Sequence, residues 1–173
     1  MASDHESVTG QRLPFDPIER AGQLWERHVG EATAMRLATS IMRVQQLVIA
    51  ELDAAVRPFG ITFARYEVLR LLSFSRAGSL PLSTIGERLM VHPTSVTNAI
   101  DRLEAHKLVT RTPDPDDRRR VLAALTDEGH DVLERATKAL MGVDFAVGAL
   151  EPADQRRTYE LLRTLRAADF DDR

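Results

Sequence analysis

One short segment of the chain, residues 93–106, carries a row of polar side chains that could contact a nucleic acid. Its apolar residues recur at spacings of four and three, as on one face of a helix: Val96, Ile100 and Leu103. The opposite side would carry hydroxyl, amide and guanidinium groups: Thr94, Ser95, Thr97, Asn98 and Arg102. Such groups bond to phosphates and base edges, and an amide such as Asn98 can pair with adenine through two hydrogen bonds. The segment predicts a DNA recognition helix, with an ordinary solvated helix face as the alternative.

The start of this helix is marked by Pro93, which we include among the candidate DNA contacts. Proline suits a first helical position because its φ is already helical and it has no amide hydrogen to leave unpaired. Asp101 lies beside the polar row. We expect its carboxylate to pair with a nearby arginine rather than to contact a base.

A predicted β-hairpin with a basic tip follows the helix. Leu108 and Val109 begin one strand, residues 121–125 form the other, and the turn over residues 112–117 holds two prolines and three aspartates. Three arginines come directly after the turn: Arg118, Arg119 and Arg120. A hairpin tip of this kind can place an arginine in an A·T-rich minor groove, where the negative potential is greatest. A lone basic triplet is usually solvated surface, but its position beside the polar helix favours a DNA-binding wing.

The elements that position these residues are predicted from the segments before them. Residues 82–89 form a short amphipathic pattern that ends at a non-helical join, Met90 to His92. Thr62 is placed to cap an earlier helix, which gives way to a loop from Ser73 to Ser79. The order helix, turn, helix, strand, wing, strand is that of a winged helix-turn-helix domain. The expected fold is mainly α with a small β-wing.

Amphipathic helices flank this domain and divide the chain further. The predicted divisions are a flexible arm (1–14), an extra N-terminal helix that starts at Asp16 (15–30), a first dimerisation helix (31–60), the winged DNA-binding lobe (61–125) and C-terminal dimerisation helices that Thr126 begins (126–173). The terminal helices have more apolar surface than a winged domain of this size needs. Two recognition helices must also be held about one DNA turn apart to bind a palindrome, which calls for a dimer.

Composition excludes several classes of protein. The 173 residues are 43% apolar and 28% charged, which is ordinary for a globular protein. The absence of cysteine excludes disulfides and thiolate metal sites. No apolar run approaches the roughly 20 residues that cross a bilayer, and the N-terminal residues do not form a signal peptide, so we expect a cytoplasmic protein with no membrane partner. The net charge of -3 means that any DNA-binding charge must be concentrated locally.

Nothing in the sequence predicts a metal site or a cofactor. The five histidines are scattered, and no two lie on one helical turn. The chain also lacks a Gly-rich phosphate loop, a nucleophile elbow and a paired-carboxylate site. We therefore expect no cofactor, no metal and no enzymatic activity.

These motifs together resemble those of the MarR family, whose members are dimeric winged helix-turn-helix transcriptional regulators. The resemblance runs from about Thr33 to Leu165 and is strongest in VHPTSVTNAIDRLEAHKLVTR and DPDDRRRVLAALTDEG. It implies that Asp117 holds Arg119 and that Arg119 enters the minor groove. It also implies major-groove contacts from the polar row and intertwined first and last helices in a homodimer on double-stranded DNA. The chain departs from the family at Lys107, where a glycine usually follows the recognition helix.

The resemblance also implies a small-molecule effector. A urate-responsive subgroup has an extra N-terminal helix with a tryptophan, an acid on the second family helix and arginines near the recognition helix and wing. This chain matches with Trp25, Glu67 and Arg111, but Ala99 stands where a ligand arginine is expected. A different anionic or aromatic ligand is easier to accommodate, with four candidate contacts: Trp25, Arg65, Glu67 and Arg111. The alternatives are simple packing for Trp25 and structural salt bridges for Glu67 and Arg111.

Three classes of function follow from these patterns. The first is a dimeric DNA-binding regulator, most commonly a repressor in such a family, that a ligand releases from a palindromic operator. The second is a winged-helix protein-interaction module without DNA binding. The third is an enzyme that uses a winged helix only to dimerise, but the chain has no cofactor-binding domain.

Overall fold

The computed structural model describes residues 13–117 and 119–167. The chain forms two compact units, residues 1–50 and residues 51–173. Most of the predicted arm, residues 1–14, lies outside the described residues, and so does Arg118. No helix in the described ranges is long and apolar enough to cross a membrane.

The first unit contains the predicted extra helix, α1 (Pro17–His28), and most of a long helix, α2 (Thr33–Val56). Asp16 caps α1 as predicted, since its Oδ1 accepts the Ile18 amide hydrogen at 2.8 Å. Arg36 on α2 bonds to Glu26 on α1 and to Glu19, at 3.2 Å. These bonds hold α1 against α2.

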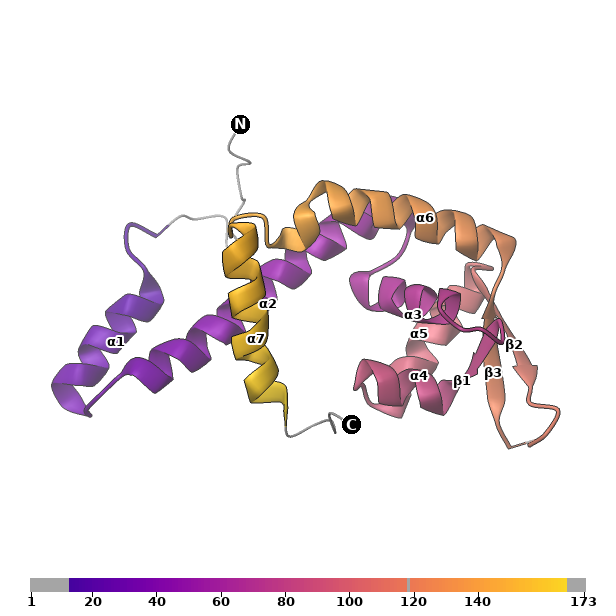
Figure 1. The fold of residues 1–173 in the computed structure, drawn as a ribbon, viewed down its shortest axis with the longest axis horizontal. Helices are drawn as coiled ribbons and strands as arrows, with labels where there is room; N and C mark the ends of the chain where they lie inside the picture. Colours follow the sequence, from indigo (N-terminus) through magenta and orange to yellow (C-terminus); the bar gives the residue numbers. More distant parts are fainter. Residues whose placement is uncertain (1–12, 118, 168–173) are drawn as a thin grey trace. The chain divides into compact units, whose positions relative to one another are not determined.

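The second unit carries the remaining elements, and Figure 1 shows its helices α3, α4 and α5 beside a small sheet. The remaining elements are η1 (Arg57–Phe59), α3 (Phe63–Ser73), β1 (Ser79–Pro81), α4 (Leu82–Leu89), α5 (Pro93–Ala105), β2 (Val109–Pro113), β3 (Val121–Leu125), α6 (Asp127–Gly142), η2 (Asp144–Ala146) and α7 (Pro152–Arg166). The sheet is antiparallel with strand order β1-β3-β2. The predicted mainly α winged fold is confirmed.

The core of this unit is built by the helix faces that the periodicity predicted. Val96, Ile100 and Leu103 on α5 are almost completely buried. They are joined by apolar residues of the neighbouring elements: Leu69, Leu72, Ile85, Val109, Ala123, Leu133 and Leu140. With its apolar face taken up by this core, α5 turns its polar row to solvent.

A short strand was not predicted, and Thr62 was predicted as a cap at the correct position but does not form the capping bond. The segment before α4 was expected to be loop up to Ser79, but Ser79–Pro81 pairs with β3 as strand β1. A strand of three residues is too short to show an alternating pattern. Thr62 occupies the N-cap position of α3 without a capping bond from its side chain, and the carboxylate of Asp53 accepts the Phe63 amide hydrogen instead, at 2.6 Å.

The end of α5 and the start of α6 are bonded to each other. The Thr126 hydroxyl donates to the Lys107 carbonyl at 2.7 Å, and the Thr126 amide donates to the Leu108 carbonyl at 3.2 Å. The same hydroxyl caps α6, as predicted, by accepting the Gly129 amide hydrogen at 3.0 Å. A Cβ atom on Gly129 would lie 2.0 Å from the Leu108 carbonyl oxygen, so glycine is required for this approach.

Large apolar side chains remain exposed on α2 and α7. None of the residues of α7 is buried. Those that expose more than half of their surface include Leu37, Met42 and Val44 on α2 and Tyr159, Leu161 and Leu165 on α7. The two helices therefore present apolar faces that the described part of one chain does not cover.

Candidate nucleic-acid interface

The recognition helix α5 is set off from α4 by a short left-handed join. Met90 has a φ of 53°, which ends α4 and redirects the chain. The His92 imidazole caps α5 by accepting the Thr94 amide hydrogen at 3.2 Å, and Pro93 follows at the first helical position as predicted. These features position the amino end of α5 at the surface.

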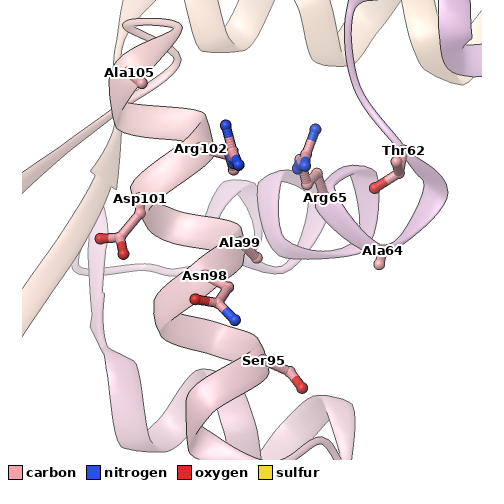
Figure 2. Close-up of a pocket in the computed structure, with 9 residues that line it drawn as sticks. All are labelled: Thr62, Ala64, Arg65, Ser95, Asn98, Ala99, Asp101, Arg102 and Ala105. Carbon is pink, nitrogen blue, oxygen red and sulfur yellow. The ribbon is translucent and has the colours of Figure 1, made fainter.

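The predicted polar row is exposed along α5. Its members are Thr94, Ser95, Thr97, Asn98 and Arg102, together with Pro93 at the start of the helix. The Thr97 hydroxyl donates to the Pro93 carbonyl at 3.1 Å, which leaves its oxygen as a free acceptor. Figure 2 shows Ser95, Asn98 and Arg102 projecting from one side of α5, whereas Asp101 points from the other side.

A hollow between the start of α3 and α5 brings four predicted site residues together: Arg65, Ser95, Asn98 and Arg102. It encloses about 760 Å³, and we call it the α3–α5 hollow; it is lined by Thr62, Ala64, Arg65, Ser95, Asn98, Ala99, Asp101, Arg102 and Ala105. Arg65 and Arg102 both reach into it (Figure 2). In the described part of the chain, neither guanidinium has an ion pair or a side-chain hydrogen bond. Arg65, predicted as an effector contact, therefore lies with the predicted DNA contacts.

The wing places Asp117 against Arg119, as the family resemblance implied. The Asp117 Oδ1 atom accepts the backbone N–H of Arg119 at 3.0 Å and its Nε–H at 3.3 Å. These two bonds hold the pKa of the Asp117 carboxyl below its ordinary value. The Arg119 side chain is 91% exposed. The carboxylate thus holds the guanidinium of Arg119 through its Nε, and among the described residues the two Nη groups remain available to a ligand.

The wing turn is closed by a second aspartate, Asp114, for which the sequence predicted no role. Asp114 is buried, accepts the Asp116 amide hydrogen at 2.9 Å and lies 3.6 Å from the Nε of Arg120. Its own amide donates to the Arg120 carbonyl at 3.0 Å. Arg120, a predicted DNA contact, therefore also stabilises the turn. An aspartate two residues before the amide that it binds is a signal of an Asx turn, and it could have been recognised in the sequence.

Arg111 on β2 ties the wing to the recognition helix. Its Nη1 donates to Asp101 at 2.7 Å, and its Nε donates to Glu104 at 2.8 Å. The guanidinium lowers the pKa of the Glu104 carboxyl, and the carboxylates raise the pKa of Arg111. The expected arginine partner of Asp101 is thus Arg111, and of the two roles considered for Arg111 the structure shows the salt bridge.

The three effector candidates of the winged unit do not share one pocket. Arg65 lines the α3–α5 hollow, Arg111 is bonded to α5, and Glu67 lines a separate pocket. Trp25 belongs to the first unit and is 41% exposed. The described residues contain no group of histidines and acids that could hold a metal ion.

Lys107, the departure from the family pattern, has a left-handed backbone. Its φ is 59°, and its amide donates to the Glu104 carbonyl at 2.8 Å. The next amide, of Leu108, donates to the Leu103 carbonyl at 2.9 Å. This is the usual glycine-type ending of a helix, formed here with a lysine. The helix end is preserved, and the lysine carries the strain.

Comparison with known proteins places the chain in a family. Residues 61–121 match the family model described as MarR family. Among solved structures, Sco5413 from Streptomyces coelicolor, a MarR family transcriptional regulator, is 52% identical with a TM-score of 0.74; the match covers 80% of this chain and 98% of Sco5413. A mutant of Escherichia coli MarR complexed with operator DNA is 25% identical with a TM-score of 0.69, over 82% of this chain and 97% of MarR.

A curated relative is also informative. The transcriptional repressor MdtR of Bacillus subtilis is 39% identical over 90 residues, which are 52% of this chain and 57% of MdtR. This chain spans little more than half the length of such curated relatives. The relatives are transcriptional regulators rather than enzymes. The winged fold, the family match over the lobe and the near-complete coverage of Sco5413 agree: the chain belongs to the MarR family of transcriptional regulators.

Proposed function

We propose that this protein is a homodimeric repressor that binds a palindromic operator and is released from it by a small anionic or aromatic ligand. The observation that carries the proposal is the pairing of Asp117 with the exposed Arg119 beside an α5 whose polar row faces solvent. In this proposal, α5 enters the major groove and Arg119 enters the adjacent minor groove.

Local charge supports DNA binding despite the negative net charge of the chain. Three carboxylates around the interface are each bonded to an arginine: Glu104 to Arg111, Asp114 to Arg120 and Asp117 to Arg119. Their repulsion of phosphates is therefore reduced. Arg65, Arg102 and Arg119 remain available to phosphates, and contacts of this kind make DNA affinity dependent on salt.

Dimerisation is supported by the uncovered apolar faces of α2 and α7. Burying such faces against a second copy would remove apolar surface from water at about 25 cal/mol per Å². Two copies are also required to hold two recognition helices roughly 34 Å apart on a palindrome. The relatives fit this assignment, because E. coli MarR has been solved with operator DNA and MdtR is a repressor.

A ligand can release the dimer from DNA only if it binds one arrangement of the dimer more tightly than the other. A 100-fold loss of DNA affinity corresponds to roughly 2.7 kcal/mol of coupling between the two sites. Arg65 and Glu67 are the effector candidates in the winged lobe that have no ion pair within the described residues. They line different pockets, so a ligand can use either one alone.

The test is fluorescence anisotropy of the purified protein on the DNA upstream of its own gene, at several salt concentrations. The wild type is expected to bind tightly and to lose affinity as salt rises, and Arg119→Ala is expected to bind about tenfold less tightly with a smaller salt slope. Arg76→Ala is the matched control, since Arg76 is exposed and lies outside the interface. Equal binding by Arg119→Ala and the wild type would contradict the role of the wing.

If the operator does not lie upstream of the protein's own gene, selection from a pool of random DNA sequences can identify it. If the protein enriches no DNA sequence and binds none in a salt-dependent way, the proposal is wrong. The winged-helix interaction module without DNA binding would then be the better assignment.

A further inference from the structure

A second pocket in the winged unit has no α5 residue in its lining. It encloses about 450 Å³, which is within the usual range of roughly 300–1,000 Å³ for small-molecule sites. Its walls are mainly aromatic: Phe63, Tyr66, Phe74 and Phe145, with two leucines. The Phe63 and Tyr66 rings stack with their centroids 5.7 Å apart. We call this the aromatic pocket.

The positive charge at its edge is already balanced. Arg70 lines the aromatic pocket, but its guanidinium donates to the Thr137 hydroxyl and lies 4.0 Å from the Glu134 carboxylate. It also lies over the rings of Tyr66 and Phe74, at 5.9 Å and 5.5 Å from their centroids. An anionic ligand would have to compete with these partners for Arg70.

The negative charge in the same pocket is not balanced. Glu67 lines the aromatic pocket and, among the residues that the structure describes, has neither an ion pair nor a side-chain hydrogen bond. Partial removal of water by the surrounding side chains raises the pKa of its carboxyl. Arg70 and Glu134 neutralise each other, so the three groups together carry one uncompensated carboxylate.

We propose that the aromatic pocket binds an organic cation with an apolar body and that the positive charge of this ligand pairs with Glu67. The faces of aromatic rings attract cations, and a counter-ion offsets the cost of ionising the carboxyl of Glu67, which is partly desolvated although the residue is exposed. As an effector site, the pocket rests on the proposed function, and it reverses the sign of the ligand charge that the family resemblance implied. The aromatic lining still favours a ligand with an apolar body, as the family resemblance implied.

Calorimetric titration of the full-length protein without DNA tests the site. The probes are tetraphenylphosphonium and tetraphenylborate, which have nearly the same size and opposite charge. The phosphonium is expected to bind at least tenfold more tightly than the borate. Glu67→Gln is expected to weaken phosphonium binding by about two- to fivefold, as the loss of one partly exposed ion pair implies. Glu128→Gln, which removes an exposed carboxylate outside the pocket, is expected to bind like the wild type.

A second variant tests the walls of the pocket. Phe74 is 71% exposed, so Phe74→Ala removes one aromatic face without emptying the core. It is expected to weaken phosphonium binding as well. Borate binding as tight as phosphonium binding, or phosphonium binding unchanged by Glu67→Gln in a folded variant, would overturn the proposal.

The anisotropy assay then tests the cation site and the proposed repressor function independently of each other. Phosphonium is expected to raise the operator Kd of the wild type and to have a smaller effect on Glu67→Gln. Phosphonium binding by a protein that binds no DNA would support the site and refute the repressor. Operator binding by a protein that ignores phosphonium would refute the cation site alone.

Discussion

Arg111 donates from its Nε to the Glu104 carboxylate across a distance of 2.8 Å, and this bond joins the first wing strand to the recognition helix. The same guanidinium also reaches Asp101, so one side chain neutralises two carboxylates on α5. Both acids would otherwise stand close to the proposed path of the DNA. Arg111 is thus a positioning residue for the interface, whether or not it contacts a ligand.

Arg111→Gln is expected to reduce operator affinity on the order of tenfold, because it leaves two uncompensated carboxylates beside the phosphates and frees the wing from α5. The loss should shrink as salt is raised. Anisotropy titration at low and high salt measures it. Adding Asp101→Asn and Glu104→Gln to the same chain is expected to restore much of the affinity, and failure to do so would show that the loss comes from wing geometry rather than charge.

Asn98→Ala is expected to relax base discrimination rather than to abolish binding. The Asn98 side chain is exposed on the polar side of α5, and one two-pronged amide contact contributes roughly 1–3 kcal/mol of discrimination. Competition binding with single-base variants of the operator measures the change. A uniform loss across all variants would instead indicate that Asn98 contacts the backbone of the DNA.

Lys107→Gly is expected to stabilise the protein by about 1 kcal/mol, because glycine adopts the left-handed backbone of this position without strain. The hydrogen bond from Thr126 is kept, since it goes to the backbone carbonyl of residue 107. Denaturant unfolding gives the free energy. Lys138→Gly, at an exposed position inside α6, is the control and should lose about 1 kcal/mol. A loss in both variants would contradict the strain at Lys107.

Glu67→Gln is expected to raise the Tm at pH 7 by about 1–2 °C. Below the ordinary value of 4.5, the carboxyl is protonated in the folded and unfolded states, so the two proteins are equally stable. As the pH rises through the raised pKa of Glu67, the folded wild type must ionise a partly desolvated carboxyl and loses stability. Thermal unfolding between about pH 4 and pH 7 follows the difference.

Asp117→Asn provides the opposite case for the same measurement. Its bonds to Arg119 lower the pKa of Asp117 below 3.8, so its contribution is present at pH 7 and is lost only as the pH falls through that lowered value. The Tm of Asp117→Asn is expected to be slightly lower at pH 7. If the Tm at pH 7 changed in the same direction in Glu67→Gln and Asp117→Asn, the opposite pKa shifts of the two carboxyls would be contradicted.

Local signals in the sequence predicted most of the interface. The spacing of Val96, Ile100 and Leu103 determined which face of α5 is buried, and the cap at Thr126 depends on residues within one helical turn. The pairing of Asp117 with Arg119 came from the family resemblance, and it also joins residues two positions apart. Such features need no knowledge of the tertiary structure.

Contacts between distant segments could not be predicted in the same way. Asp53 caps α3 from ten residues away. For Arg111, the sequence left two roles open, a ligand contact and a salt bridge, and did not show that Asp101 would be a partner. The effector candidates were grouped by resemblance, but Arg65 and Glu67 lie two positions apart on α3 and therefore point into different pockets. Such pairings depend on how the helices pack, and this packing cannot be inferred from a single sequence.

The two hydrogen bonds from Thr126 to the carbonyls of Lys107 and Leu108 bear on how a ligand would release the proposed repressor from DNA. They fasten the end of α5 to the start of α6, while Arg111 fastens α5 to the wing. Both sets of bonds act on the carboxyl-terminal part of α5, while its buried face of Val96, Ile100 and Leu103 holds the rest of the helix against the core. In the proposed dimer, a bound ligand would have little freedom to tilt α5 within the lobe, so we expect the distance between the two recognition helices to change by rotation of whole lobes.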